Sequence, residues 1–247
     1  MSSSQWNEII AKSSEAKSVD DVHKLCATVA DSLGFDRFLY SAQFPTSLVR
    51  AQIVIISAYA PEWRSHYDSM HYATADPTVA YCKSHVTPII WDQIDLSAAG
   101  PKARRVMNEA CEFGLRSGIS IPIRGTQGEG AMLSLVSSAD HKKVKAHILQ
   151  VAPFAQFLSG FIHEASKRVF SESQMLLSED SLTGREKECL LWAAEGKTTW
   201  ETSQILSITE RTVNFHLQNV TAKLQVSNRA HAVARAISQH LISPQLA

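Results

Sequence analysis

The stretch from Ser207 to Leu224 constrains the chain most, because it predicts a helix with two unlike faces. One face is an apolar stripe at helical spacing, made of Val213, Leu217, Val220 and Leu224. The opposite face carries Arg211, Asn214, Phe215, Gln218, Asn219 and Ala222, with Lys223 at its edge. Amides and guanidinium groups can pair with base edges, and an aromatic ring can meet a thymine methyl group. Taken alone, the helix fits a DNA reader and a surface helix of a small bundle equally well.

The neighbouring segments favour the DNA reader. The predicted helices run from Leu182 to about Glu195, from Thr198 or Thr199 to about Leu206, from Ser207 or Thr209 to Leu224, and from Asn228 to His240. Gly196 ends the first of them. Two helices joined by a tight turn around Ser207, with the second presenting a polar face, make a helix-turn-helix.

The run from Leu182 to Ala230 resembles the LuxR-type DNA-binding domain. The matching stretches are Leu182-Thr-Gly-Arg-Glu186-Lys-Glu-Cys-Leu190, Ala193-Ala-Glu-Gly196-Lys-Thr, Ile208-Thr-Glu-Arg-Thr-Val213-Asn-Phe-His216 and Lys223-Leu-Gln-Val-Ser-Asn-Arg229-Ala. The resemblance implies a four-helix domain whose third helix enters the major groove, with Glu186, Leu190 and Gly196 serving the fold. One departure is that Glu201 is followed by Thr202 and Ser203, where the family usually has an apolar pair. This departure weakens the packing stripe of the second helix.

Physical chemistry divides the expected DNA contacts into two classes. The expected backbone contacts are Lys197, Thr198, Arg211, Thr212, Lys223 and Arg229, the first two at a helix N-terminus that suits a phosphate. Asn214 and Gln218 are the predicted base readers, and their alternative role is that of two water-facing amides.

The charge of the chain gives no overall attraction to nucleic acid, since 24 basic residues balance 24 acidic ones over 247 residues. Residues 182–247 hold seven basic and five acidic residues, a net charge of +2, and the remainder carries −2. DNA affinity must therefore come from the placement of charges and from a dimer. The length suits two domains, and an apolar content of 45% indicates a globular protein.

The four cysteines, Cys26, Cys82, Cys111 and Cys189, are far apart in the sequence. A zinc site and a disulfide framework are therefore not expected, and neither is a metal or another cofactor. The N-terminus has no export signal and no apolar window approaches a membrane span, so we expect a cytoplasmic protein.

The N-terminal half predicts strands flanked by helices. The predicted strands are 35–44, 52–59, 119–123 and 131–137, with a short extended segment at 88–91, and a turn is expected at 45–47. The predicted helices are 5–16, one from Ser18 that Gly34 stops, a short one from Pro61, 78–84, 99–113 and 142–168. The Gly-rich loop 125–130 joins two strands and predicts a hairpin turn rather than a phosphate site. The sum is an α+β fold in which helices cover both faces of a sheet. The expected domains are 1–168 and 182–247, joined by a polar linker at 169–181.

One carboxylate lies among large aromatic residues with a single polar atom each. The set consists of Tyr59, Trp63, Tyr67, Asp76 and Trp91. Trp63 and Tyr67 are one helical turn apart, so both can line one cavity. The set fits a ligand pocket, in which a bound amide N–H satisfies Asp76, and it also fits a core whose groups satisfy one another.

The pattern Tyr59-x3-Trp63-x3-Tyr67-x8-Asp76-Pro77-x13-Trp91, followed by Gly118, resembles the autoinducer-binding domain of LuxR-type quorum-sensing regulators. That family's ligands are N-acyl homoserine lactones. The resemblance implies that Trp63 donates to the lactone carbonyl, Asp76 accepts from the amide N–H, and Tyr67 helps hold the amide carbonyl. It also implies that Trp91 packs on the lactone ring and that Tyr59 and Ser134 assist at the amide or acyl end. Candidates around the acyl chain are Leu39, Val54, Ile56, Val79 and Leu133.

The sequence thus predicts a dimeric, lactone-responsive transcription factor on an inverted-repeat operator, with RNA polymerase as a further partner. A regulator without its own synthase, which answers another small molecule or needs no ligand, stays open as an alternative. An enzyme acting on the lactone is a remote one, because no Gly-x-Ser-x-Gly or His-rich metal motif is present. A phosphoreceiver domain is disfavoured because Asp20-Asp21 opens a helix instead of ending a strand.

Overall fold

The computed structural model describes residues 3–47, 50–126, 128–175, 182–239 and 241–242. The chain divides into two compact units. One is built from residues 1–43, 53–125 and 130–173, and the other mainly from residues 174–247. Each unit has its own apolar core.

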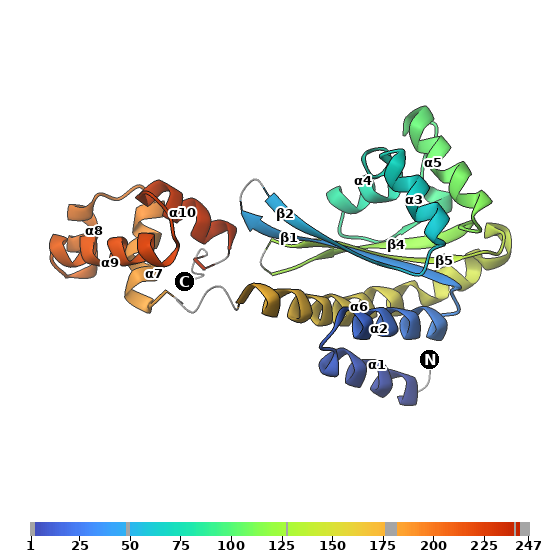
Figure 1. The fold of residues 1–247 in the computed structure, drawn as a ribbon, viewed down its shortest axis with the longest axis horizontal. Helices are drawn as coiled ribbons and strands as arrows, with labels where there is room; N and C mark the ends of the chain where they lie inside the picture. Colours follow the sequence, from blue (N-terminus) through green and yellow to red (C-terminus); the bar gives the residue numbers. More distant parts are fainter. Residues whose placement is uncertain (1–2, 48–49, 127, 176–181, 240, 243–247) are drawn as a thin grey trace. The chain divides into compact units, whose positions relative to one another are not determined.

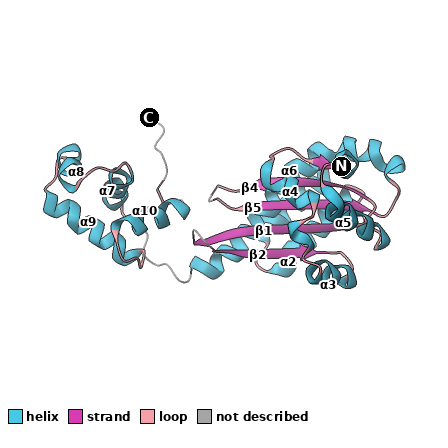
Figure 2. Cartoon of the chain, turned by 90° about the horizontal axis from the view of Figure 1, so that it is seen from above, coloured by secondary structure: helices cyan, strands magenta, loops and turns pink. Residues whose placement is uncertain are grey.

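A five-stranded sheet forms the centre of the first unit (Figure 2). Its strands are β1 (Arg37–Ser47), β2 (Arg50–Ser57), β3 (Ile89–Ile90), β4 (Ser117–Arg124) and β5 (Gly130–Ser137). They lie in the order β2-β1-β5-β4-β3, and β5 pairs antiparallel with both β1 and β4. The predicted hairpin around the Gly-rich loop is therefore confirmed. The turn predicted at 45–47 is wrong, because β1 continues through Ser47.

Helices cover both faces of the sheet (Figure 1). On one face lie α3 (Pro61–Ser69), α4 (Pro77–Ser84) and α5 (Gly100–Glu112), with the short 3-10 helices η1 (Tyr72–Thr74) and η2 (Trp91–Gln93) in the connections. On the other lie α2 (Val19–Ser32) and α6 (His141–Met175), and α1 (Ser3–Glu15) packs outside α2. The predicted helix–sheet–helix arrangement is confirmed. We call the two sides of the sheet the α3 face and the α6 face.

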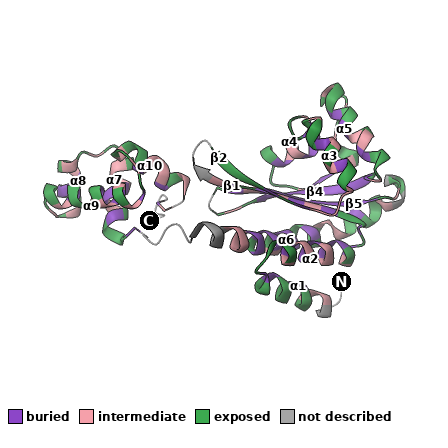
Figure 3. Cartoon of the chain, viewed as in Figure 1, coloured by how far each residue is buried: buried purple, intermediate pink, exposed green. Residues whose placement is uncertain are grey.

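Side-chain alternation assigns each strand position to one of these faces. Tyr40 of β1 lies on the α6 face, where its hydroxyl is 2.8 Å from Nδ1 of the buried His163 on α6. Leu133 of β5 pairs directly with Tyr40 and so shares that face, whereas Ser134 points to the α3 face. Both β4 and β5 are buried along almost their whole length (Figure 3), because helices cover them on both sides.

The helix α6 is longer than its sequence pattern predicts. It continues to Met175, so residues 169–175 of the predicted linker are helical, and residues 176–181 lie outside the described part of the chain. A polar composition rich in Ser and Glu does not separate a helix from a linker, which is why the sequence pattern places this end too early.

Four helices form the second unit. They are α7 (Gly184–Ala194), α8 (Thr199–Leu206), α9 (Glu210–Lys223) and α10 (Arg229–Ser238). The apolar stripe of α9 is buried in the core of this unit together with Leu190, Ala232 and Ala236. The predicted four-helix order is confirmed. Thr202 and Ser203 are also buried, and the Thr202 hydroxyl has no hydrogen-bond partner among the described residues.

Candidate functional site

A line of hydrogen bonds crosses the α3 face of the sheet. The indole N–H of Trp91 donates to Oγ of Ser120 over 2.9 Å, and that oxygen lies 2.8 Å from Oγ of Ser134. Ser120 and Ser134 face each other directly in the β4–β5 register. The Tyr59 side chain, just after β2, is hydrogen-bonded to Ser134 in turn. Three of the predicted ligand residues are thus brought together by a fourth residue, Ser120, that sequence reasoning missed.

Gly118 allows Trp91 to lie against the sheet. A Cβ atom at Gly118 would lie 3.2 Å from the Trp91 ring and 2.7 Å from the carbonyl oxygen of Leu135. Real Cβ atoms do not approach a backbone oxygen that closely, so a larger residue would displace the strand or the indole. Glycine is therefore required at this position by close packing.

Asp76 caps a helix and also accepts a hydrogen bond from a predicted ligand residue. It is the N-cap of α4, where Oδ1 accepts hydrogen bonds from the backbone N–H and the hydroxyl of Thr78 over 2.8 and 2.6 Å. The other oxygen, Oδ2, accepts from the hydroxyl of Tyr67 over 2.9 Å. The carboxylate is therefore satisfied by the protein itself, while Oδ2 keeps a lone pair for a further donor.

The two phenols beside Asp76 keep their protons. Burial and then the negative charge of Asp76 raise the pKa of Tyr59, and the same two causes, together with the hydrogen bond to Asp76, raise the pKa of Tyr67. Both hydroxyls are therefore hydrogen-bond donors at neutral pH.

An aromatic cluster lies beside this polar line. Trp63 and Tyr67 of α3 have ring centroids 5.7 Å apart in an edge-on arrangement, and Trp63 is only 2% exposed. Tyr72, Val106 and Leu115 belong to the same buried cluster, against which Tyr59 and Trp91 also pack. The five predicted aromatic and acidic residues thus share one region of the α3 face.

In the second unit, the turn before α9 has the geometry of a helix-turn-helix. Ser207 ends α8 in the left-handed region with φ 54°, and Thr209 caps α9 by accepting from the N–H of Thr212 over 3.1 Å. The predicted cap is therefore Thr209. Arg211, Asn214 and Gln218 are exposed on α9, and Phe215 beside them is 58% exposed.

The remaining predicted DNA contacts lie at the helix ends. Thr198 caps α8 in a capping box with Glu201, and Lys197 precedes it. The guanidinium of Arg229 donates to the carbonyl oxygen of Lys197, which ties the start of α10 to the start of α8. Lys223, at the end of α9, forms an ion pair with Glu186 of α7, with Nζ 2.9 Å from the carboxylate. Its contact with a DNA backbone stays a prediction.

Comparison with known proteins assigns both units. The family described as "Autoinducer binding domain" matches residues 18–166, and the family described as "Bacterial regulatory proteins, luxR family" matches residues 180–236. The chain belongs to the LuxR family. The transcriptional activator protein AhyR of Aeromonas hydrophila is 35% identical over 92% of this chain and 88% of its own length. This LuxR-family chain therefore carries an autoinducer-binding domain followed by a DNA-binding helix-turn-helix domain.

Solved structures share the fold of this LuxR-family chain. SdiA, a protein of Escherichia coli, in complex with octanoyl-rac-glycerol is 20% identical with a TM-score of 0.70, covering 97% of this chain and 96% of that one. CepR2 of Burkholderia cenocepacia, an N-acylhomoserine lactone dependent LuxR family transcription factor, is 22% identical with a TM-score of 0.56. That match covers 67% of this chain and 96% of CepR2.

Two of the acyl-chain candidates of this LuxR-family chain, Leu39 and Leu133, lie on opposite faces of the sheet. Leu39 pairs directly with Ser134 and so lies on the α3 face. Leu133 pairs directly with Tyr40 and so lies on the α6 face, the face opposite to Ser134. Met132 lies on the α3 face, since it is buried and two residues from Ser134 along β5. A period of two along β5, counted from Ser134, is the signal in the sequence that separates these residues.

Two absences concern only the part of the LuxR-family chain that the structure describes. Within it, no cluster of three or more His, Cys, Asp or Glu side chains is arranged to hold a metal ion. None of the described helices combines the length and the apolar character that crossing a membrane requires.

Proposed function

We propose that this chain is a quorum-sensing transcriptional activator that binds an N-acyl homoserine lactone and, as a dimer, an inverted-repeat operator. The observation that supports the ligand class best is the pairing of Tyr67 with Asp76 beside the hydrogen-bonded line from Trp91 to Tyr59. An acyl amide offers one N–H donor and one carbonyl acceptor, and this surface offers a carboxylate acceptor next to protonated hydroxyl donors.

In the proposed complex, Oδ2 of Asp76 accepts from the ligand amide N–H while it keeps its bond to Tyr67. The indole of Trp63 donates to the lactone carbonyl, and Trp91 packs on the lactone ring. The hydroxyls of Tyr59 and Ser134 serve the amide carbonyl or a substituent of the acyl chain. The acyl chain then runs along the α3 face of the sheet, toward Leu39 and Met132.

In the proposed DNA complex, α9 enters the major groove. Asn214 and Gln218 read base edges, and Phe215 meets a thymine methyl group. The proposed phosphate contacts are Lys197, Thr198, Arg211, Thr212, Lys223 and Arg229.

Arg211→Ala should then lower, by about one, the magnitude of the slope of the logarithm of the DNA-binding constant against the logarithm of the salt concentration. Asn214→Ala should instead relax sequence preference by about 1–3 kcal/mol at one base pair and leave the salt dependence unchanged.

An exposed apolar surface on α6 supports the dimer. Leu149, Phe154 and Phe157 are 52%, 39% and 56% exposed, and Trp6 of α1 contacts both phenylalanine rings. Such a surface is typical of a protein–protein interface.

The net charge of +2 on residues 182–247 is small, so one DNA-binding domain should bind weakly and the dimer tightly. An isolated fragment of residues 178–247 that binds operator as tightly as the full chain would contradict the dimer.

We further propose that ligand binding completes the core of the first unit and so favours the DNA-binding dimer, which recruits RNA polymerase in the cytoplasm. Mass spectrometry of small molecules that copurify with the protein tests the ligand class directly. Soluble yield with and without a panel of acyl homoserine lactones shows whether the fold depends on them.

The SdiA complex favours acylglycerols as a second candidate ligand class. Both classes combine an acyl chain with a polar head, and only the lactone class has an amide N–H for Asp76. Octanoyl-rac-glycerol therefore belongs in the same binding panel. Tight binding of the glycerol ester with no binding of any lactone would replace the proposed ligand, and turnover of a lactone by the purified protein would indicate an enzyme instead.

A further inference from the structure

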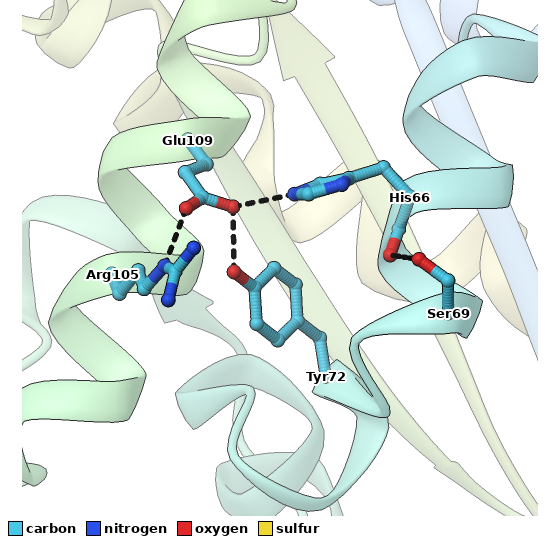
Figure 4. Close-up of polar contacts among 5 residues, drawn as sticks. All are labelled: His66, Ser69, Tyr72, Arg105 and Glu109. Carbon is cyan, nitrogen blue, oxygen red and sulfur yellow. Dashed lines mark hydrogen bonds and ion pairs between the residues drawn. The ribbon is translucent and has the colours of Figure 1, made fainter.

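The carboxylate of Glu109 on α5 joins three elements of the α3 face (Figure 4). It accepts a hydrogen bond from Nε2 of His66 on α3 over 2.7 Å and from the hydroxyl of Tyr72 in η1 over 2.6 Å. Arg105, one turn earlier on α5, donates from Nε over 2.6 Å. A carboxylate only accepts, so the His66 ring carries its proton on Nε2. We call Glu109, His66 and Tyr72 the Glu109 clamp.

Hydrogen bonds from these donors stabilise the ionised form of Glu109. Hydrogen bonds from Tyr72, then Arg105 and then His66 lower the pKa of Glu109 to about 2, so it is ionised at any physiological pH. Its side chain is only 19% exposed, whereas that of Arg105 is 57% exposed. The bonds to His66 and Tyr72 are therefore less screened by water than the bond to Arg105.

The two hydrogen-bond donors of the Glu109 clamp, His66 and Tyr72, pack against predicted ligand residues. His66 is next to Tyr67 in the sequence, and its ring centroid lies 6.0 Å from that of Trp63. The Tyr72 ring lies edge-on to Tyr67 at 5.9 Å and tilted to Trp63 at 6.3 Å. Val106 and Ala110 of α5, on either side of Glu109, pack into the same buried cluster. A shift of α5 relative to α3 would therefore move Trp63 and Tyr67.

We propose that Glu109 is a positioning residue for ligand recognition, which fixes Trp63 and Tyr67 through His66 and Tyr72. This inference rests on the proposed function. The hydrogen bonds of Glu109 go to His66, Tyr72 and Arg105, so its effect on Trp63 and Tyr67 passes through the rings of His66 and Tyr72. Those rings serve the polar head of the ligand, and the acyl-chain positions Leu39 and Met132 lie on the sheet. Loss of the clamp should therefore weaken binding by the same factor for every acyl chain length.

The test compares Glu109→Gln with Glu112→Gln in the full chain. Gln keeps the size of the side chain and loses its charge, and Glu112 is an exposed residue one turn along the same helix. The dissociation constants of hexanoyl to dodecanoyl homoserine lactones should rise about tenfold for Glu109→Gln, since bonds to a charged acceptor are lost. They should stay unchanged for Glu112→Gln. Unchanged affinity, or a loss that depends on chain length, would overturn the proposal.

A second readout needs no ligand. With 5-fluorotryptophan incorporated, the fluorine resonance of Trp63, assigned through Trp63→Phe, should shift in Glu109→Gln and not in Glu112→Gln. If the wild-type chain binds no lactone, the proposed function fails, and an unshifted Trp63 resonance would separately overturn the clamp. If Glu109→Gln does not fold, Tyr72→Phe removes one donor and keeps the ring. It should then raise every dissociation constant about threefold, and unchanged constants would overturn the proposal.

Discussion

The ammonium of Lys223 lies 2.9 Å from the carboxylate of Glu186 and links the last turn of α9 to the first turn of α7. Glu186 is 3% exposed and also accepts from the backbone N–H of Thr183 over 2.8 Å. One carboxylate thus completes the capping box of α7 and pairs with the helix that presents the predicted base readers. The orientation of α9 in its unit depends in part on this ion pair.

Lys223→Met should destabilise the isolated 178–247 fragment by about 3 kcal/mol, because it leaves a buried carboxylate without its counter-charge. Urea unfolding of the fragment measures this loss. Lys187→Met, which removes an exposed lysine from α7, is the matched control. A change of less than about 0.5 kcal/mol would show that the ion pair is dispensable and would leave Lys223 to its proposed DNA contact.

The stability of the same fragment should fall in acid because of Glu186. Burial raises the pKa of Glu186, but hydrogen bonds from Thr183 and Lys223 outweigh burial, and the net pKa is lowered. A carboxyl whose pKa is lower in the folded state stabilises above its unfolded pKa of about 4.3, and this contribution is lost as pH falls through the folded value. Melting temperatures between neutral and acid pH should therefore fall less steeply for Glu186→Gln than for Glu188→Gln. Parallel curves would refute the assignment.

Asp76→Asn should raise the ligand concentration needed for half-maximal reporter response by about tenfold or more, because Tyr67 and the ligand amide lose a charged acceptor. Asn still caps α4, so the fold should persist. Asp95→Asn is the control, since Asp95 likewise accepts from the backbone N–H groups two and three residues later, those of Ser97 and Ala98, but lies exposed outside the site. A full response from Asp76→Asn would count strongly against the proposed ligand site.

Gly118→Ala should destabilise the first unit by about 1–3 kcal/mol through overpacking against Leu135 and Trp91. It should also weaken ligand binding, because the indole is displaced from Ser120. Thermal unfolding and ligand titration of the full chain measure the two effects. Gly160→Ala on α6, where a Cβ meets nothing within 4 Å, should be neutral or stabilising. Equal behaviour of the two variants would show that the close approach at Gly118 is tolerated.

Thr202→Val should stabilise the second unit by about 1 kcal/mol. Its hydroxyl is buried between helices without a partner among the described residues, and Val has the same shape without the polar atom. Chemical unfolding of the 178–247 fragment measures the gain. Thr221→Val, whose hydroxyl donates to the carbonyl oxygen of Gln218, should give no comparable gain. A loss of stability in Thr202→Val would mean that the hydroxyl is satisfied in solution.

Local chemistry made most of the fold predictable. The capping residues Ser18, Thr198 and Asn228 and the positive-φ glycines Gly34 and Gly196 set helix boundaries that the sequence pattern located closely. The predicted end of α6 is wrong because a polar composition does not separate a helix from a linker.

The site was less predictable, because its contacts join residues far apart in the chain. The aromatic pattern on α3 named residues that the structure brings together on the α3 face, but Ser120 became visible only through the register that places it opposite Ser134. Glu109 carried no local signal, since its partners His66 and Tyr72 lie 43 and 37 residues away in the sequence. Lys223 was expected to face DNA, and only the packing of α9 on α7 revealed Glu186 as its partner.

Alternation along β4 and β5 places two sets of side chains on opposite faces of the sheet. Ser120 and Ser134 lie on the α3 face. On the α6 face, the buried side chains are Ile119, Ile121, Leu133 and Leu135. Substitutions at every second position therefore change the surface that is proposed to meet the ligand without altering the side chains packed against α6. On the proposed function, a single substitution at Ser120 or Ser134 changes the surface offered to a signal molecule and leaves the side chains between the sheet and α6 unchanged.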